Sequence, residues 1–122
     1  MTETQQRKIA VVDDDHAVRE SLRFLLEVAG HTVETFSSAA EFLKGEMHYL
    51  WCLILDHHMP HMTGLQLAER LREAGVNIPI LLVTGSPSPA IVARAAELGI
   101  ERVLAKPPNE DELFNFINAA RR

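Results

Sequence analysis

The sequence feature that most constrains the fold is the apolar run Trp51–Leu55, which ends abruptly at Asp56 and is followed by a turn at Pro60. A continuous apolar run of this length is typical of a strand buried on both faces, which requires a parallel sheet covered by helices. A carboxylate at the end of such a strand lies at the rim of the sheet, where open α/β folds bind ligands. Taken alone, Asp56 is explained more simply as the start of a turn. The other strand ends decide between these two interpretations.

The rest of the chain alternates strands and helices. Further strands are predicted over residues 8–12, 32–36, 78–84 and 102–105. Helical spacing of apolar residues, with capping residues such as Ser38, Thr63 and Ser88, predicts a helix after each strand. Strict alternation of five strands and five helices indicates a parallel sheet with right-handed crossovers. The expected fold class is α/β: a flavodoxin-like, doubly wound, five-stranded parallel sheet in the order 2-1-3-4-5 with five helices.

Length and composition set the outer bounds. The 122 residues predict one domain over residues 1–122, with residues 1–6 disordered. No apolar run approaches the roughly 20 residues of a membrane span, and the first residues do not form a signal peptide, so we expect a cytoplasmic protein without membrane contact. The net charge of −5 argues against direct nucleic-acid binding by this domain. Cys52 lies within an apolar strand, where we expect it to be inert.

The strand ends share one chemistry. The first, third, fourth and fifth strands end at Asp13 and Asp14, at Asp56, at Thr84 and at Lys106. Parallel strands place their carboxyl ends on one rim, so these side chains are expected to converge on one pocket. Clustered carboxylates repel one another unless a cation joins them, and a hard divalent cation with oxygen ligands, Mg²⁺, fits best. With an ammonium and a hydroxyl group alongside, the pocket has what phosphoryl transfer requires.

Four motifs in the right order give the chain a family resemblance. They are Val11–Asp14 (Val-Val-Asp-Asp), Asp56-x-x-Met-Pro-x-x-x-Gly64, Thr84-Gly85 and Lys106-Pro107. Together they span nearly the whole chain, and the sequence resembles the receiver domains of two-component response regulators.

The resemblance implies a phospho-accepting switch that catalyses only its own phosphorylation and dephosphorylation. Asp56 would accept a phosphoryl group from a sensor histidine kinase or a phosphotransfer protein. The implied Mg²⁺ ligands are Asp14, Asp56 and the backbone carbonyl of His58, with Asp13 assisting through water. Thr84 and Lys106 would bind phosphoryl oxygens, and the Lys106–Pro107 bond would be cis.

The chain departs from the family pattern in three places. Val103 stands where a tyrosine or phenylalanine is usual, so signalling through the fourth helix and fifth strand is in doubt. Pro108 adds a second proline after the lysine. The acceptor is followed by His57, His58 and His61, for whose imidazole rings we expect no metal role; the side chain of His58 is expected to influence the lifetime of the phosphoryl group.

Two alternatives remain open. In a haloacid-dehalogenase-like phosphatase, Asp13 would be the nucleophile and Asp15 the acid, but no later acidic pair at a strand end completes that site, and Asp56 stays unexplained. A non-phosphorylated pseudo-receiver would act only as a binding module, which the complete set of site residues disfavours.

The partner surface is expected on the side of the first and last helices. The residues of the first helix expected to face the core are Val18, Leu22, Leu25 and Ala29. Phe24 and Val28 fall outside this stripe, one above the other, and Phe114 falls outside the inward set of the last helix. We therefore expect a partner contact, or a homodimer, through Phe24, Val28 and Phe114.

Overall fold

The computed structural model describes residues 7–47 and 49–120, so the expected disorder of residues 1–6 lies outside the described part. Five parallel strands form one sheet in the order β2-β1-β3-β4-β5. The strands are β1 (Lys8–Val12), β2 (Thr32–Phe36), β3 (Leu50–Asp56), β4 (Ile80–Thr84) and β5 (Arg102–Ala105). The predicted fold class and strand order are confirmed.

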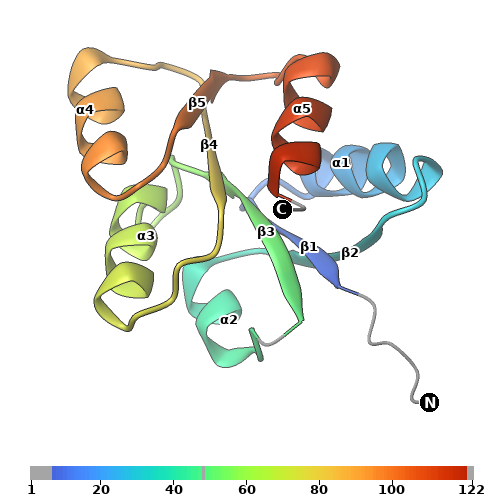
Figure 1. Cartoon of the computed structure of the whole chain (residues 1–122), viewed down its shortest axis with the longest axis horizontal. Coiled ribbons are helices and arrows are strands. Elements are labelled where there is room, and N and C mark those ends of the chain that lie inside the picture. Colours follow the sequence, from blue (N-terminus) through green and yellow to red (C-terminus); the bar gives the residue numbers. More distant parts are fainter. Residues whose placement is uncertain (1–6, 48, 121–122) are drawn as a thin grey trace.

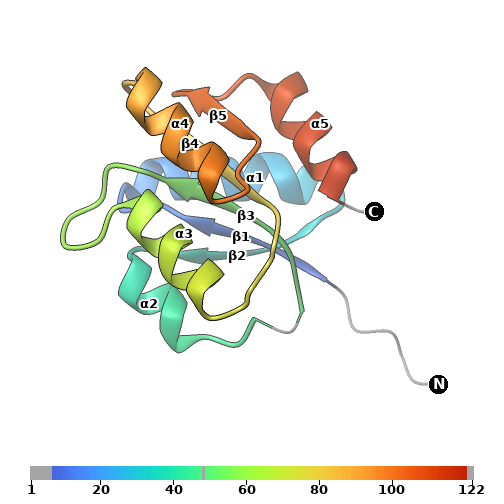
Figure 2. The same ribbon diagram turned by 60° about the vertical axis from the view of Figure 1, so that its left-hand side comes forward.

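Helices cover both faces of the sheet. They are α1 (His16–Val28), α2 (Ala39–Lys44), α3 (Gly64–Glu73), α4 (Pro89–Glu97) and α5 (Glu110–Ala120). In Figures 1 and 2, α1 and α5 lie on one face and α2, α3 and α4 on the other. Among the described helices, none combines the length and the apolar composition that a bilayer crossing requires.

The apolar run of β3 is divided between two cores. Leu53 and Leu55 belong to the core beneath α2, α3 and α4, and Ile54 to the core beneath α1 and α5. All three side chains are at most 2% exposed. Because successive side chains of a strand point to opposite faces, only a strand covered on both sides gives such an uninterrupted apolar run.

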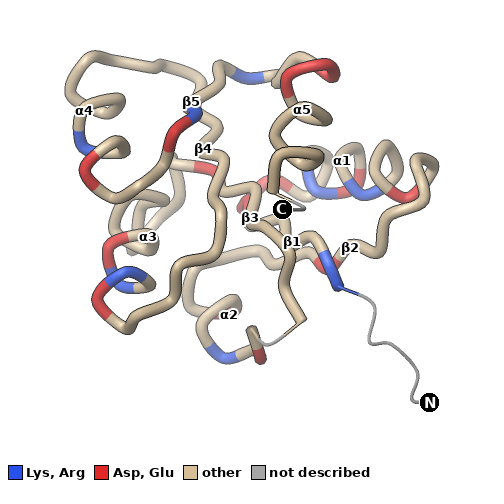
Figure 3. Tube along the Cα trace, viewed as in Figure 1, with Lys and Arg blue, Asp and Glu red and all other residues tan. Residues whose placement is uncertain are grey.

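The register of the sheet brings the strand ends level. Val12 pairs with Leu55, and Thr84 pairs with Ala105. Asp13 and Asp56 directly follow the first pair, and Lys106 directly follows Ala105 of the second. The ends of β1, β3, β4 and β5 therefore form one rim. In Figure 3, charged residues lie mostly on the helices and near strand ends, and β4 carries none.

Two sequence-based predictions are wrong in detail: the start of the fourth strand and the core-facing residues of the first helix. The fourth strand begins at Ile80 rather than Ile78, because the carbonyl of Ile78 accepts a hydrogen bond from Arg72. In α1 the buried residues are Leu22 and Leu26. Ala29 is exposed, because the helix ends at Val28 and a core stripe extrapolated beyond that residue no longer applies.

The exposure expected for the partner surface is confirmed on α1 and wrong on α5. Phe24 and Val28 are 71% and 70% exposed. Phe114 instead lies partly buried against the core beneath α1 and α5. Its ring stacks on that of His31, with centroids 6.4 Å apart. An aromatic ring covered in this way is part of the fold and does not join the α1 patch, which we define as Phe24 and Val28.

Candidate functional site

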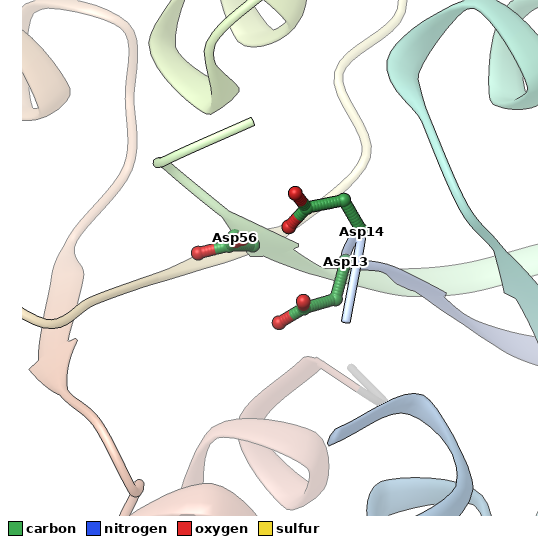
Figure 4. Close-up of side chains that lie close together, drawn as sticks. All are labelled: Asp13, Asp14 and Asp56. Carbon is green, nitrogen blue, oxygen red and sulfur yellow. The ribbon is translucent and has the colours of Figure 1, made fainter. Parts of the chain in front are cut away.

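Three aspartates meet at the rim of the sheet. Asp13 and Asp14 follow β1 and Asp56 ends β3, and one carboxylate oxygen from each lies within 4.8 Å of the others. Figure 4 shows the three side chains at adjacent strand ends. Asp13 and Asp56 are buried, whereas Asp14 is exposed. The predicted convergence is therefore present, with one carboxylate open to solvent.

Lys106 bridges the two buried carboxylates. Its Nζ atom lies 2.9 Å from Oδ1 of Asp56 and 3.1 Å from Oδ2 of Asp13. Burial acts to lower the pKa of the Lys106 ammonium group, but the hydrogen bonds and charges of Asp56 and Asp13 outweigh it and raise that pKa. Lys106 is therefore a fixed positive charge in the pocket. The Lys106–Pro107 peptide bond that follows is cis, as predicted.

The two oxygens of Asp56 differ. Oδ1 accepts from Lys106 and, at 3.4 Å, from the backbone N–H of His58. Oδ2 is buried and has no hydrogen-bond partner among the described residues. Burial raises the pKa of Asp56 and the charge of Asp13 adds to this effect, while the hydrogen bond from Lys106 opposes it. An unpaired buried carboxylate oxygen is unfavourable and marks the place where an external group can bind.

Thr84 completes the rim at the end of β4. Its side chain is fully buried, and its Oγ1 accepts a hydrogen bond of 3.2 Å from the backbone N–H of Ser86. Its carbonyl accepts from the backbone N–H of Lys106 at 3.0 Å. Two predicted phosphoryl-binding residues are thereby linked through their main chains.

The β1–α1 turn is built by Asp15. Its backbone N–H donates to Oδ1 of Asp13 at 2.8 Å, and its own carboxylate caps α1 by accepting from the N–H groups of Ala17 and Val18. A carboxylate that caps a helix has a structural role. This argues against the phosphatase alternative, which requires Asp15 as an acid.

The loop after β3 is packed against the backbone of Asp56. A Cβ atom added to Gly64 would lie 2.5 Å from the carbonyl oxygen of Asp56, so only glycine fits at this position of the motif. His57 and His58 have ring centroids 4.9 Å apart. Burial, with a smaller effect of His58, lowers the pKa of His57. Within residues 7–47 and 49–120, the three aspartates are the one group of metal-binding side chains that the structure brings together, and no histidine joins it.

The residues present fit a hard divalent cation. Three clustered carboxylates supply oxygen ligands of the kind that Mg²⁺ prefers. The unpaired Oδ2 of Asp56 and the unshielded Asp14 supply acceptors that the protein itself leaves open. Sequence reasoning missed Arg19, which donates from Nη1 to the carbonyl of Asp13 at 2.8 Å. Contacts between a side chain and a main-chain carbonyl have no sequence signature.

Comparison with known proteins agrees with this geometry. The family model of the response regulator receiver domain matches residues 9–118. The response regulator protein TodT of Pseudomonas putida is 40% identical over 113 residues, covering 92% of this chain and 50% of TodT. The transcriptional regulatory protein FixJ of Bradyrhizobium diazoefficiens is 36% identical over 120 residues, covering 98% of this chain and 58% of FixJ.

Solved structures show the same likeness. The response regulator StyR superposes with a TM-score of 0.84 at 38% identity, covering 95% of this chain and 59% of that chain. The chemotaxis protein CheY4 of Vibrio cholerae superposes with a TM-score of 0.84 at 28% identity, covering 95% of this chain and 99% of CheY4. The chain spans about half the length of the curated relatives named here.

These observations define a signalling module rather than an enzyme. The chain belongs to the response regulator receiver domain family of two-component systems, with the acidic pocket formed by Asp13, Asp14 and Asp56.

Proposed function

We propose that Asp56 is the phosphoryl acceptor of this receiver domain and that the donor is a phosphohistidine of a sensor histidine kinase or a phosphotransfer protein. The observation that carries the proposal is the difference between the two oxygens of Asp56. Lys106 engages Oδ1, and Oδ2 is buried without a partner among the described residues. A carboxylate fixed by one oxygen presents the other to an incoming phosphorus atom.

The transfer is an in-line displacement. Oδ2 of Asp56 forms the new P–O bond, and the P–N bond to the donor imidazole breaks. Lys106, already 2.9 Å from Asp56, offsets negative charge on the phosphoryl oxygens. The hydroxyl of Thr84 donates to one of those oxygens; in its present contact with Ser86 the Thr84 oxygen is the acceptor, which leaves the hydroxyl proton available.

Mg²⁺ is the cofactor that this pocket supports. Asp14, Asp56 and the backbone carbonyl of His58 would hold the ion directly, with Asp13 assisting through water. When bound, the ion stabilises negative charge on the phosphoryl group. The support is the clustering of the three carboxylates within 4.8 Å.

The output is a change in protein–protein contacts. Phosphorylation adds negative charge at the rim, and the loops that follow β4 and β5 rearrange to meet it, so that the affinity for a partner changes by a population shift. Val103 has no ring to move, and it lies half-buried against the core beneath α2, α3 and α4. The shift therefore proceeds without an aromatic switch at this position.

The α1 patch is the surface that we propose for docking, either of the phosphodonor or of a second copy of the chain. A cavity of about 720 Å³ lies beside it, lined by residues that include Phe24, Pro107, Pro108 and Asp56. A partner seated on Phe24 and Val28 would thus have access to the acceptor. We place the protein in the cytoplasm, as is typical of this family.

Sedimentation tests whether the α1 patch binds a second copy of the chain. Wild type and a Phe24→Ser, Val28→Ser double variant are compared with and without phosphorylation. A wild-type protein that stays monomeric in both states excludes the homodimer, and unchanged kinase docking in the double variant excludes the patch altogether.

Acetyl phosphate tests the acceptor. Incubation with acetyl phosphate and Mg²⁺ should add a single phosphate, measured by intact-mass spectrometry. Asp56→Asn should lose the adduct, and Asp15→Asn, which alters only the cap of α1, should keep it. Labelling of Asp56→Asn at the wild-type level contradicts the assignment. A wild-type protein that never labels supports the pseudo-receiver alternative, and turnover of small phosphomonoesters would revive the phosphatase.

A further inference from the structure

Arg19 makes its main polar contact with the backbone of the acidic pocket. From the second turn of α1, Nη1 of Arg19 donates to the carbonyl oxygen of Asp13 at 2.8 Å, and Nη2 lies 3.3 Å from Nδ1 of His16. Within the described part of the chain, Arg19 forms no salt bridge with a carboxylate. A guanidinium group directed at a main-chain carbonyl rather than at a carboxylate requires an explanation other than charge pairing.

Asp13, the residue whose carbonyl Arg19 contacts, is held by three hydrogen bonds. The N–H of Asp13 donates to the carbonyl of Phe36 at 3.1 Å, which continues the pairing of β1 with β2. Oδ1 of Asp13 accepts from the N–H of Asp15 at 2.8 Å. Arg19 takes the remaining group, the carbonyl of Asp13. Of the three bonds, only the one from Arg19 is made to the Asp13–Asp14 peptide itself, so Arg19 is the side chain that restrains the orientation of that peptide.

Asp14 has no such support of its own. Its carboxylate is exposed and accepts no hydrogen bond from the described residues, yet one of its oxygens lies within 4.8 Å of those of Asp13 and Asp56. A peptide unit is planar, so the carbonyl direction of Asp13 fixes the N–H of Asp14 and constrains where its side chain begins. The direction of the Asp14 carboxylate thus depends on the backbone that Arg19 holds.

We propose that Arg19 is a positioning residue that orients the Asp13–Asp14 peptide so that the carboxylate of Asp14 faces Asp56 and the two can share one divalent cation. The proposal rests on the proposed function, because it assigns Mg²⁺ to these carboxylates. Contacts of this kind, one shell away from the ligands, typically change metal affinity by about 10–100-fold.

If Arg19 acts through its charge, its removal changes the Mg²⁺ affinity in one direction, and if it positions Asp14, its removal changes that affinity in the opposite direction. A positive charge near a cation site weakens cation binding, so if Arg19 acted only through its charge, its removal would tighten Mg²⁺ binding. If Arg19 positions Asp14, its removal weakens Mg²⁺ binding. The sign of the change therefore separates the two roles, which a loss of activity alone would not do.

The experiment measures Mg²⁺ binding by calorimetry, without a kinase. Arg19→Met keeps an apolar stem and removes the donor and the charge, and we expect the dissociation constant to rise about tenfold. The matched control is Arg23→Met on the same helix. Its guanidinium contacts Oγ1 of Thr35 rather than the pocket, so we expect an unchanged or slightly lower dissociation constant.

The remaining variants separate the possible failures. Arg19→Gln, a good helix former with a shorter side chain, repeats the test if Arg19→Met does not fold, as judged by circular dichroism. An unchanged or tighter Mg²⁺ affinity in whichever variant folds overturns the role of Arg19. Asp14→Ala tests the metal assignment separately: if it binds Mg²⁺ as tightly as wild type, both the assignment and the role of Arg19 fail. Wild-type labelling by acetyl phosphate tests the acceptor independently of Arg19.

Discussion

The Nζ atom of Lys106 lies 2.9 Å from Oδ1 of Asp56, although the two residues come from strands separated by β4 in the sheet. The contact occupies one oxygen of the acceptor and leaves the other unpaired. The half-buried ammonium group of Lys106 thus compensates part of the charge of Asp56 before any ligand arrives. The compensation is incomplete, since burial and Asp13 still raise the pKa of Asp56.

Asp56→Asn should therefore stabilise the fold at pH 7. The raised pKa means that the folded protein binds the proton of Asp56 more tightly than the unfolded chain does. The contribution of neutral Asp56 is fully present below its unfolded pKa and is lost as the pH rises through its folded pKa. At pH 7 the charged carboxylate opposes folding, and its removal should raise the free energy of unfolding by about 1 kcal/mol.

Urea denaturation at pH 7 and at pH 4 measures this difference. The gain of Asp56→Asn over wild type should shrink as the pH falls through the folded pKa of Asp56. Asp14→Asn is the control, because Asp14 is exposed and its charge is solvated. A gain that grows on acidification would contradict the direction of the pKa shift.

Mg²⁺ should stabilise the folded protein through Asp14. An ion that binds only the folded state raises the free energy of unfolding by about 2.7 kcal/mol at 100 times its dissociation constant. Thermal unfolding with Mg²⁺ and with EDTA checks this, and the difference should largely vanish in Asp14→Ala. Equal stabilisation of wild type and Asp14→Ala would place the ion elsewhere.

Gly64→Ala should disrupt the support of the acceptor. The added methyl group would lie 2.5 Å from the carbonyl oxygen of Asp56 and 2.9 Å from Cα of His57, and neither is a flexible side chain. We expect a loss of about 2 kcal/mol, as for overpacking in a core. The control is Gly45→Ala, whose new Cβ would meet nothing closer than 3.5 Å and should be close to neutral. Similar stabilities for the two variants would show that the α3 start can move away from the strand.

Arg72→Met should destabilise the end of α4. Arg72 donates to the carbonyls of Leu98, Val76 and Ile78 at 2.8, 2.9 and 2.9 Å, and so joins α3 to the end of α4 and to the segment that precedes β4. A buried carbonyl left without a donor costs about 1–3 kcal/mol; these three are partly buried, so we expect a total of about 3 kcal/mol by urea denaturation. Arg94→Met is the control, because an exposed ion pair with Glu69 contributes at most about 1 kcal/mol.

The sequence was sufficient for the parts of the site that depend on topology. Strand ends in a parallel sheet share a rim, so Asp13, Asp56, Thr84 and Lys106 could be placed together from the order of the elements alone. The buried β3 was equally predictable from its apolar run, because each residue of such a strand contacts one of two cores.

The contacts that depend on side-chain direction could not be predicted. Arg19 and Arg72 donate hydrogen bonds to main-chain carbonyls. Every residue has such a carbonyl, so no pattern of residue types in the sequence predicts these contacts. Phe114 was expected on the surface because helical spacing defines a face of one helix. Its exposure also depends on His31, which lies in a different segment and covers its ring. Tertiary neighbours decide such cases.

The pocket draws its parts from four strands, and the last of them, β5, is followed immediately by Lys106. During synthesis the chain emerges from the ribosome with its amino end first. Asp13 and Asp56 would both be outside long before the ammonium group that bridges them. A nascent chain would therefore hold two uncompensated acids and should not accept a phosphoryl group until the fifth strand has joined the sheet. Chemical labelling of Asp56 would then report that β5 has joined the sheet, which a measurement of helix content does not.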